Sequence, residues 1–235
     1  PNHDLGTMKD FENKYKGLNQ GTNAFQDSSN NAFRKDIAPY IYTQKNNLNV
    51  KNDIHEVKIQ LTDSQKKKYK ESEKRYTIEK GKEIPGAASR RDNRAYDIIH
   101  NGSPEDNSKM NQILSIMETK HPGEKAVIHV YRRNALQTAK EALEKKYGPG
   151  SVWVIHGDTP NVLADKQKAD FNDPDGKIKF LLGTKSLEAG HNLQHGGTVT
   201  FHLDIPQTAA AFDQRNKRIY RKGQPKDTNT YILRS

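Results

Sequence analysis

The sequence predicts an α/β fold in which a mostly parallel sheet is covered by helices on both faces. Two observations lead to this prediction. From about residue 105 onward, the chain contains short apolar runs rich in strand-forming residues, and segments of helical pattern separate these runs. Such an alternation is typical of a parallel sheet with two covered faces. The residues before this point are polar and irregular and lean toward helix.

The polar first part of the chain is expected to form a partly irregular helical extension. We expect short helices over 8–15 and 32–40, a strand over 55–61 and a longer helix over 63–78. Thr62 or Asp63 could cap that last helix. The run 101–104, Asn-Gly-Ser-Pro, contains strong breakers. It therefore predicts a boundary between a region 1–104 and a domain 105–235.

The expected elements of the second domain follow one another closely. In chain order they are helix 106–119, strand 126–131, helix 133–146, strand 152–155, helix 161–171, strand 178–182, strand 198–202, helix 207–221 and strand 229–233. Trp153 lies within one of these apolar runs and is expected to pack in the core.

Composition narrows the classes of function. The 235 residues carry a formal net charge of +10, which favours polyanionic partners. The chain contains no cysteine, so disulfides, thiolate metal sites and cysteine nucleophiles are excluded. No apolar run approaches the length of a membrane span. We therefore expect a protein of the cytoplasm, or of the host-cell compartment that holds DNA, without a membrane partner.

The segment 214–224 is the most informative in the chain. It reads Gln-x-x-x-Arg-x-x-Arg-x-Gly-Gln and places Gln214, Arg218 and Arg221 at i, i+4 and i+7. On a helix these three residues share one face, whereas Arg215 lies on another and is expected to matter little. Guanidinium forks on that face suit the phosphates of a nucleotide. The alternative is a solvated basic helix.

This segment resembles motif VI of superfamily 2 helicases, in particular the Swi/Snf branch of DNA translocases. Further segments resemble other motifs of the same family in the expected order. They are 127–131 for motif IV, 155–159 with Phe171-Asn172 for the segment after it, 179–193 for motif V, and Asp204 with Pro206 for the stretch before motif VI. The resemblance implies that the α/β domain is a RecA-like helicase C-terminal lobe.

The first half resembles the entry into this lobe less closely. The similar segments are 39–42, 48–51, 61–69 and 108–110. Three positions depart from the family pattern: Thr43-Gln44 replace paired arginines, Glu188 replaces a glycine, and Ala164 replaces an arginine. These departures bear on nucleic-acid contacts more than on ATP chemistry.

The resemblance implies an ATP site that this chain completes only in part. It assigns Arg218 and Arg221 as catalytic arginine fingers, and Gln214, Gly190 and Asn192 as nucleotide contacts. The sequence contains neither a Gly-x-x-x-x-Gly-Lys-Ser/Thr motif nor an Asp-Glu pair. A first RecA-like lobe of the same parent polypeptide is therefore expected to hold most of the ATP and Mg²⁺, and this chain alone is expected to be inactive.

The resemblance also implies contacts to DNA, with duplex bound without sequence preference. The residues assigned to these contacts are Thr184, Lys185, Gly157 and Arg132. Some features have simpler explanations. Gly183 and Gly190 could be present merely because they permit tight turns, and the lysines at 66–68 could form a solvated helix face. His191 and His195 are spaced like zinc ligands, but glycines around them favour a loop and no further ligand is evident, so no metal site is expected.

Two other classes of function stay open. One is a nucleic-acid-binding module that has no role in ATP hydrolysis, which would keep the basic surface without needing an arginine pair. The other is an interaction protein derived from a helicase lobe, for which the departures at 43, 44 and 164 are the best support.

Overall fold

The structure is a computed structural model that describes residues 48–75, 87–103, 106–188, 192–206 and 208–235. By its internal contacts the chain divides into two units, Pro1–Asn47 and Leu48–Ser235, and every described residue belongs to the second unit. The helices expected over 8–15 and 32–40 lie outside the described residues.

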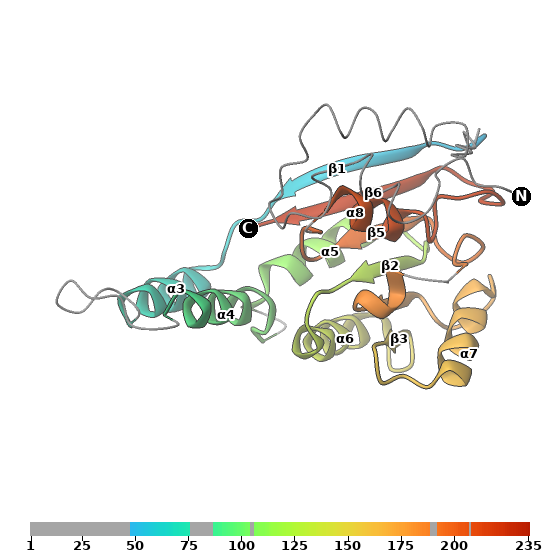
Figure 1. Cartoon of the computed structure of the whole chain (residues 1–235). Helices are drawn as coiled ribbons and strands as arrows, with labels where there is room; N and C mark the ends of the chain where they lie inside the picture. Colours follow the sequence, from blue (N-terminus) through green and yellow to red (C-terminus); the bar gives the residue numbers. More distant parts are fainter. Residues whose placement is uncertain (1–47, 76–86, 104–105, 189–191, 207) are drawn as a thin grey trace, which may run out of the picture. The chain divides into compact units, whose positions relative to one another are not determined.

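A single all-parallel sheet forms the centre of this unit (Figure 1). Its strands are β1 (Asn52–Lys58), β2 (Ala126–His129), β3 (Val152–Ile155), β4 (Phe180–Gly183), β5 (Val199–His202) and β6 (Thr228–Arg234). The strand order is β1-β6-β5-β2-β4-β3, and every neighbouring pair is parallel. The carboxyl ends of all six strands therefore lie at one edge of the sheet.

Helices connect these strands. In the described part of the chain they are α3 (Asp63–Arg75), α4 (Ala87–His100), α5 (Ser108–Thr119), α6 (Arg133–Tyr147), α7 (Asn161–Asn172) and α8 (Ala209–Asn216), with a short 3₁₀ helix, η3 (Lys185–Glu188). Helices α3 and α4 pack against each other beyond the carboxyl edge of the sheet (Figure 1).

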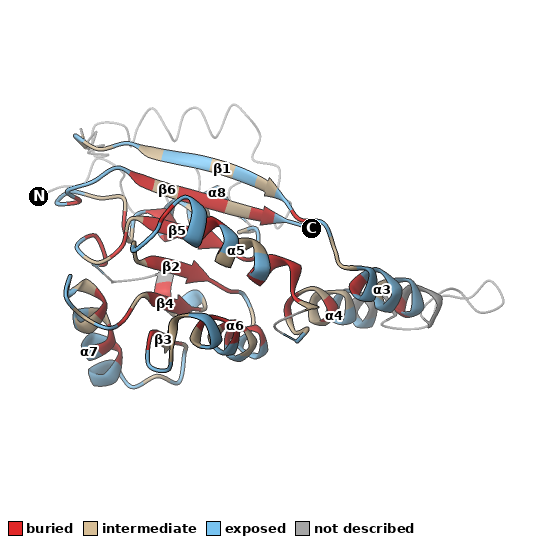
Figure 2. Ribbon diagram, turned by 180° about the vertical axis from the view of Figure 1, so that it is seen from behind, coloured by how far each residue is buried: buried red, intermediate tan, exposed pale blue. Residues whose placement is uncertain are grey.

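The sheet has a buried core on each face, as its alternating side chains require. Ala126 and Ile128 of β2 belong to one cluster with apolar residues of α5 and α6. Val127, between them, belongs to a second cluster with Phe171 of α7 and Ile219, which follows α8. The central strands are consequently buried along their length, while the outer surfaces of the helices are exposed (Figure 2). The predicted RecA-like α/β architecture is confirmed.

Most predicted elements agree with the structure, and the last helix is the main correction. The helix expected over 207–221 ends at Asn216, and Thr208 caps its start by accepting a hydrogen bond from the Ala211 N–H at 3.1 Å. The chain turns after Asn216 because the Ile219 side chain is buried in the core and the Leu193 N–H donates to the Arg218 carbonyl. Helix α4 was not assigned from the sequence.

The strand β1 adds a detail to the predicted domain organisation. It begins at Asn52, within the region 1–104, yet it pairs along its whole length with β6. The sheet therefore takes one edge strand from before the boundary expected at 104/105. That boundary stays a prediction about how the parent protein is divided.

Candidate functional site

The predicted nucleotide residues lie where two loops meet. A guanidinium N–H of Arg221 donates a hydrogen bond to the Asn192 side-chain oxygen. The Leu193 N–H, next to Asn192 in the chain, donates to the backbone carbonyl of Arg218 at 3.0 Å. Arg218 Nε in turn donates to the backbone carbonyl of Gln214 at 2.9 Å. Residues assigned separately to motifs V and VI are thus in direct contact.

The two arginines of this cluster influence each other electrostatically. The pKa of Arg218 is lowered, first because the side chain is partly buried and second because the charge of Arg221 is nearby. Two cationic guanidinium groups that repel each other are stabilised by a shared anion. This donor set fits a polyphosphate.

A side chain that the sequence did not single out as a site residue holds one loop of the cluster. The Asn172 amide donates to the Asn192 carbonyl at 2.7 Å and accepts from the Gly196 N–H at 2.9 Å. On the other loop, the buried Gln224 amide donates to the Gly197 carbonyl at 3.0 Å. The sequence could have indicated these two amides, because the motif pairs Phe171-Asn172 and Gly223-Gln224 each supply one of them.

The helical face drawn through Gln214, Arg218 and Arg221 is not what brings these residues together. Only Gln214 lies in α8, while the two arginines follow on the turn. Gly190 lies outside the described residues. A local contact joins Arg218 to Gln214, while Asn192 and Leu193 contact the two arginines from the other loop.

A second group of predicted residues lines a cavity of about 540 Å³ at the carboxyl edge of the sheet. Thr184, Lys185 and Gly157 all contribute to its wall, as does Arg133. Thr184 directly follows β4, and its N–H donates to the Ile155 carbonyl at 3.2 Å. The backbone at the ends of two neighbouring strands therefore fixes one side of the cavity.

Arg132 lies apart from the other three predicted nucleic-acid residues. Its guanidinium lies over the Tyr96 ring of α4, 4.4 Å from the centroid, and donates to the Asn93 side chain at 2.6 Å. The next residue, Arg133, lines the cavity with those three residues and forms an ion pair with Asp158.

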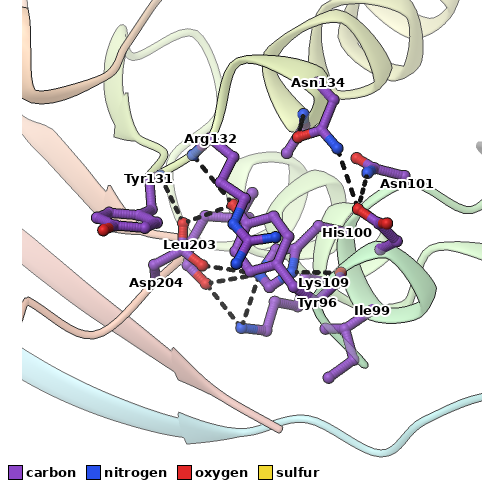
Figure 3. Close-up of polar contacts among 12 residues, drawn as sticks. Tyr96, Ile99, His100, Asn101, Lys109, Tyr131, Arg132, Asn134, Leu203 and Asp204 are labelled. Atoms are coloured by element: carbon purple, nitrogen blue, oxygen red, sulfur yellow. Dashed lines mark hydrogen bonds and ion pairs between the residues drawn. The ribbon is translucent and has the colours of Figure 1, made fainter. Parts of the chain in front are cut away.

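Beside this cavity, Asp204 is the centre of a largely buried polar network (Figure 3). Its carboxylate accepts from the Tyr131 N–H at 2.7 Å and from the Tyr96 hydroxyl at 3.1 Å, and it contacts His100 Nε2 at 3.0 Å. Lys109 of α5 lies in the same network and donates to the Leu203 carbonyl at 2.7 Å. The carboxyl ends of β2 and β5 are thereby tied to α4 and α5.

Burial and charge shift the pKa values within this network. Burial lowers the pKa of Lys109 to about 8, although the charge of Asp204 opposes that shift. Burial by itself raises the pKa of Asp204, but hydrogen bonding and charge from His100, then the Tyr131 N–H and Lys109, bring it below its usual value. Asp204 is therefore a carboxylate that accepts hydrogen bonds at neutral pH.

Arg215 is a further correction, since it was expected on an indifferent face. Arg215 is buried, with 5% of its surface exposed. Its guanidinium donates a hydrogen bond to the backbone carbonyl of Asp204 at 3.4 Å. It lies near His129 and His202, whose pKa values are lowered chiefly by burial. Loss of Arg215 would therefore disturb packing, and the residue is unsuitable as a neutral control.

In the part of the chain that the structure describes, no group of three or more His, Asp or Glu side chains is arranged to hold a metal ion. Across the same residues, no helix is long and apolar enough to cross a membrane. His191 lies outside them, so its pairing with His195 is not described.

Comparison with known proteins identifies the fold and the family of the central segment. Residues 108–223 match the family described as helicase conserved C-terminal domain. A search of curated proteins finds no match to this chain.

Several solved structures are similar. The SWI2/SNF2 ATPase core of Sulfolobus solfataricus in complex with dsDNA has a TM-score of 0.63 and 21% identity, over 97% of this chain and 51% of that chain. The C-terminal part of the Fun30 ATPase domain has a TM-score of 0.62 and 15% identity, over 78% of this chain and 85% of that chain. The isolated C-terminal domain of the Sulfolobus solfataricus SWI2/SNF2 ATPase has a TM-score of 0.57 and 17% identity, over 77% of this chain and 78% of that chain. This chain thus spans about half of the Sulfolobus core.

Proposed function

We propose that this chain is the second motor lobe of an ATP-dependent DNA translocase, because residues 108–223 match the helicase conserved C-terminal domain family. In this proposal a first RecA-like lobe of the same parent polypeptide holds most of the ATP and Mg²⁺. The present lobe adds Arg218 and Arg221 to the γ-phosphate. Its similarity in fold to a Swi2/Snf2 core that was solved with dsDNA supports duplex DNA as the polymer that is moved.

The contact between Arg221 and Asn192 is the observation that carries this proposal. It brings together residues that two separate motifs, far apart in the sequence, assign to one nucleotide site. The nearby charge of Arg218 supports the same assignment, because two adjacent guanidinium groups match the charge that develops as a phosphoryl group leaves. ATP with Mg²⁺, when bound, supplies the bond whose hydrolysis drives closure of the two lobes.

The proposed DNA contacts are Thr184, Lys185 and Gly157, which share one cavity, with Arg133 beside them. The exposed Lys185 ammonium suits a phosphate, and it forms no ion pair with any residue that the structure describes. Arg132 contributes from the neighbouring surface near Tyr96. A DNA duplex that both lobes hold by its phosphates would be moved along by one step when the lobes close.

The decisive test is Arg221→Ala in the protein that contains both lobes. We expect DNA-stimulated ATP turnover to fall by about 10³-fold, as for arginine fingers elsewhere, while DNA affinity changes little. Arg221→Lys should restore little, because a point charge does not reproduce a planar fork with two donors. Lys222→Ala is the matched control, since Lys222 is the adjacent exposed cation.

The result also separates the proposal from a nucleic-acid-binding module without a motor role. If Arg221→Ala hydrolysed ATP at the normal rate, the assignment of Arg221 as a finger would be wrong. If DNA binding by this chain were in addition unaffected by a partner ATPase lobe, the binding module would be the better description.

A further inference from the structure

A second cavity lies next to the one lined by Thr184 and Lys185, along the carboxyl edge of the sheet. This second cavity has a volume of about 300 Å³ and is lined by the cationic residues Lys109, Arg132 and Arg234 and by the Asp204 carboxylate. Arg234 also forms an ion pair with Glu56 at 2.8 Å. Both cavities share the side chains of Tyr131 and Ile205. The two shared residues therefore form a ridge, which we call the Tyr131–Ile205 ridge, between two hollows whose linings carry more cationic than anionic side chains.

The ridge is unusual because it is apolar and exposed. Tyr131 is 56% exposed and Ile205 is 53% exposed, and they extend from the ends of the adjacent strands β2 and β5. A phosphate-binding surface needs donors and positive charge and gains nothing from exposed apolar side chains. An apolar ridge between two hollows with a net positive lining matches a polymer in which apolar and anionic groups alternate.

The ridge is also held rigidly from its inner side. The Asp204 carboxylate fixes the Tyr131 backbone through its N–H, and Ile205 is the next residue after Asp204 in the chain. The Tyr131 ring points away from this buried network (Figure 3). The Tyr131 backbone is therefore fixed before a ligand binds, which limits the conformational entropy lost on binding to that of the exposed side chains.

We propose that the Tyr131–Ile205 ridge packs against the deoxyribose face of a bound DNA strand whose phosphates lie in the two flanking hollows. This inference rests on the proposed function and extends it to a determinant of sugar specificity. Deoxyribose offers apolar C2′ methylene to the ridge. Ribose would place a hydroxyl there, and burying a hydroxyl without a hydrogen-bond partner is unfavourable.

The test is the affinity of this chain for two single-stranded oligomers of equal length, oligodeoxyuridylate and oligouridylate. These probes differ only at the 2′ position. The unmodified chain should bind the deoxy oligomer more tightly. Tyr131→Ala should weaken that binding by about tenfold, the scale of one aromatic contact, and should weaken oligouridylate binding less. Tyr131→Phe should retain the preference, because the contact uses the ring.

Salt dependence separates the ridge from the phosphate contacts. Tyr131→Ala removes no charge, so the slope of log affinity against log salt concentration should stay unchanged. Lys185→Ala should weaken both oligomers alike and reduce the slope by about one. Val162→Ala is the control for truncating an exposed apolar side chain, since Val162 is 85% exposed and lines neither cavity.

Each outcome decides the proposal. If Tyr131→Ala left both affinities unchanged while Lys185→Ala weakened them, the ridge would have another role, such as contacting the first lobe, and the DNA site would stand. An equal loss for both oligomers would show contact with the base and overturn the assignment to the sugar. If Lys185→Ala and Thr184→Ala also had no effect, the proposed DNA site itself would be wrong.

Discussion

Gly183 illustrates how one residue in a functional motif can be required by packing alone. A Cβ at this position would lie 2.6 Å from Leu187 Cβ and 3.1 Å from the Ile155 carbonyl oxygen. The close approach of η3 to the end of β4 therefore excludes a side chain. The structural explanation weighed from the sequence, a tight strand-to-loop connection, accounts for this glycine.

We expect Gly183→Ala to lower the free energy of unfolding by about 1–3 kcal/mol, because the added methyl group must displace backbone or a buried side chain. Gly157→Ala is the matched control. A Cβ at Gly157 meets only the end of the Arg133 side chain, at 3.4 Å, which can move. Urea unfolding of both variants checks this, and equal stabilities would contradict the close packing at Gly183.

A second prediction at the residue scale concerns the proposed phosphate contact. Thr184 lines the carboxyl-edge cavity, whereas Lys67 is an exposed residue of α3. Thr184→Ala should therefore weaken duplex binding by this chain more than Lys67→Ala does, even though it removes no charge. Titrations at one fixed low salt concentration provide the comparison. A larger loss for the lysine would move the DNA contact to the basic run on α3.

At the scale of elements, α8 covers a buried polar layer on β2 and β5. The rings of His129 and His202 stack with centroids 5.5 Å apart, and His202 Nε2 lies 2.9 Å from the Asn216 side-chain oxygen. Burial lowers the pKa of His202 to about 4. Both rings are therefore neutral in the folded protein at neutral pH.

This layer predicts a loss of stability in acid. The unfolded chain takes up a proton on His202 near its ordinary pKa of about 6.5, whereas the folded chain does so only near pH 4. Stability should therefore decrease as the pH falls from about 6.5 to about 4, because the unfolded state binds more protons in that range. His202→Gln retains a donor for Asn216 without titrating, so its melting temperature should fall less over this range. A parallel pH dependence for both proteins would contradict the prediction.

At the scale of the whole chain, the sequence contains no Gly-x-x-x-x-Gly-Lys-Ser/Thr, the motif that forms the phosphate cradle of P-loop ATPases. We expect the purified chain neither to hydrolyse ATP nor to bind it tightly, because two arginines cannot replace a backbone cradle, a lysine and a metal site. Steady turnover that survives further purification, and that Arg221→Ala abolishes, would contradict the assignment to a second lobe.

Sequence patterns determined the class of fold and most of its elements. The apolar strands were found because burial on both faces requires continuous hydrophobic runs, which local composition reveals. The motifs also identified which residues to consider, because their spacing along the chain is itself the signal. These properties depend on residues that are close in sequence.

Only the tertiary structure decided how the site residues are arranged. Local periodicity favoured a helix through Arg221, but burial of Ile219 and the bond from Leu193 to Arg218 end α8 at Asn216. Arg133 lines the carboxyl-edge cavity, whereas Arg132 lies over Tyr96 of α4, and this difference between two neighbouring residues likewise depends on tertiary contacts. Contacts between residues distant in the chain can outweigh the weak local preference of a single turn of helix, and no pattern within one segment records them.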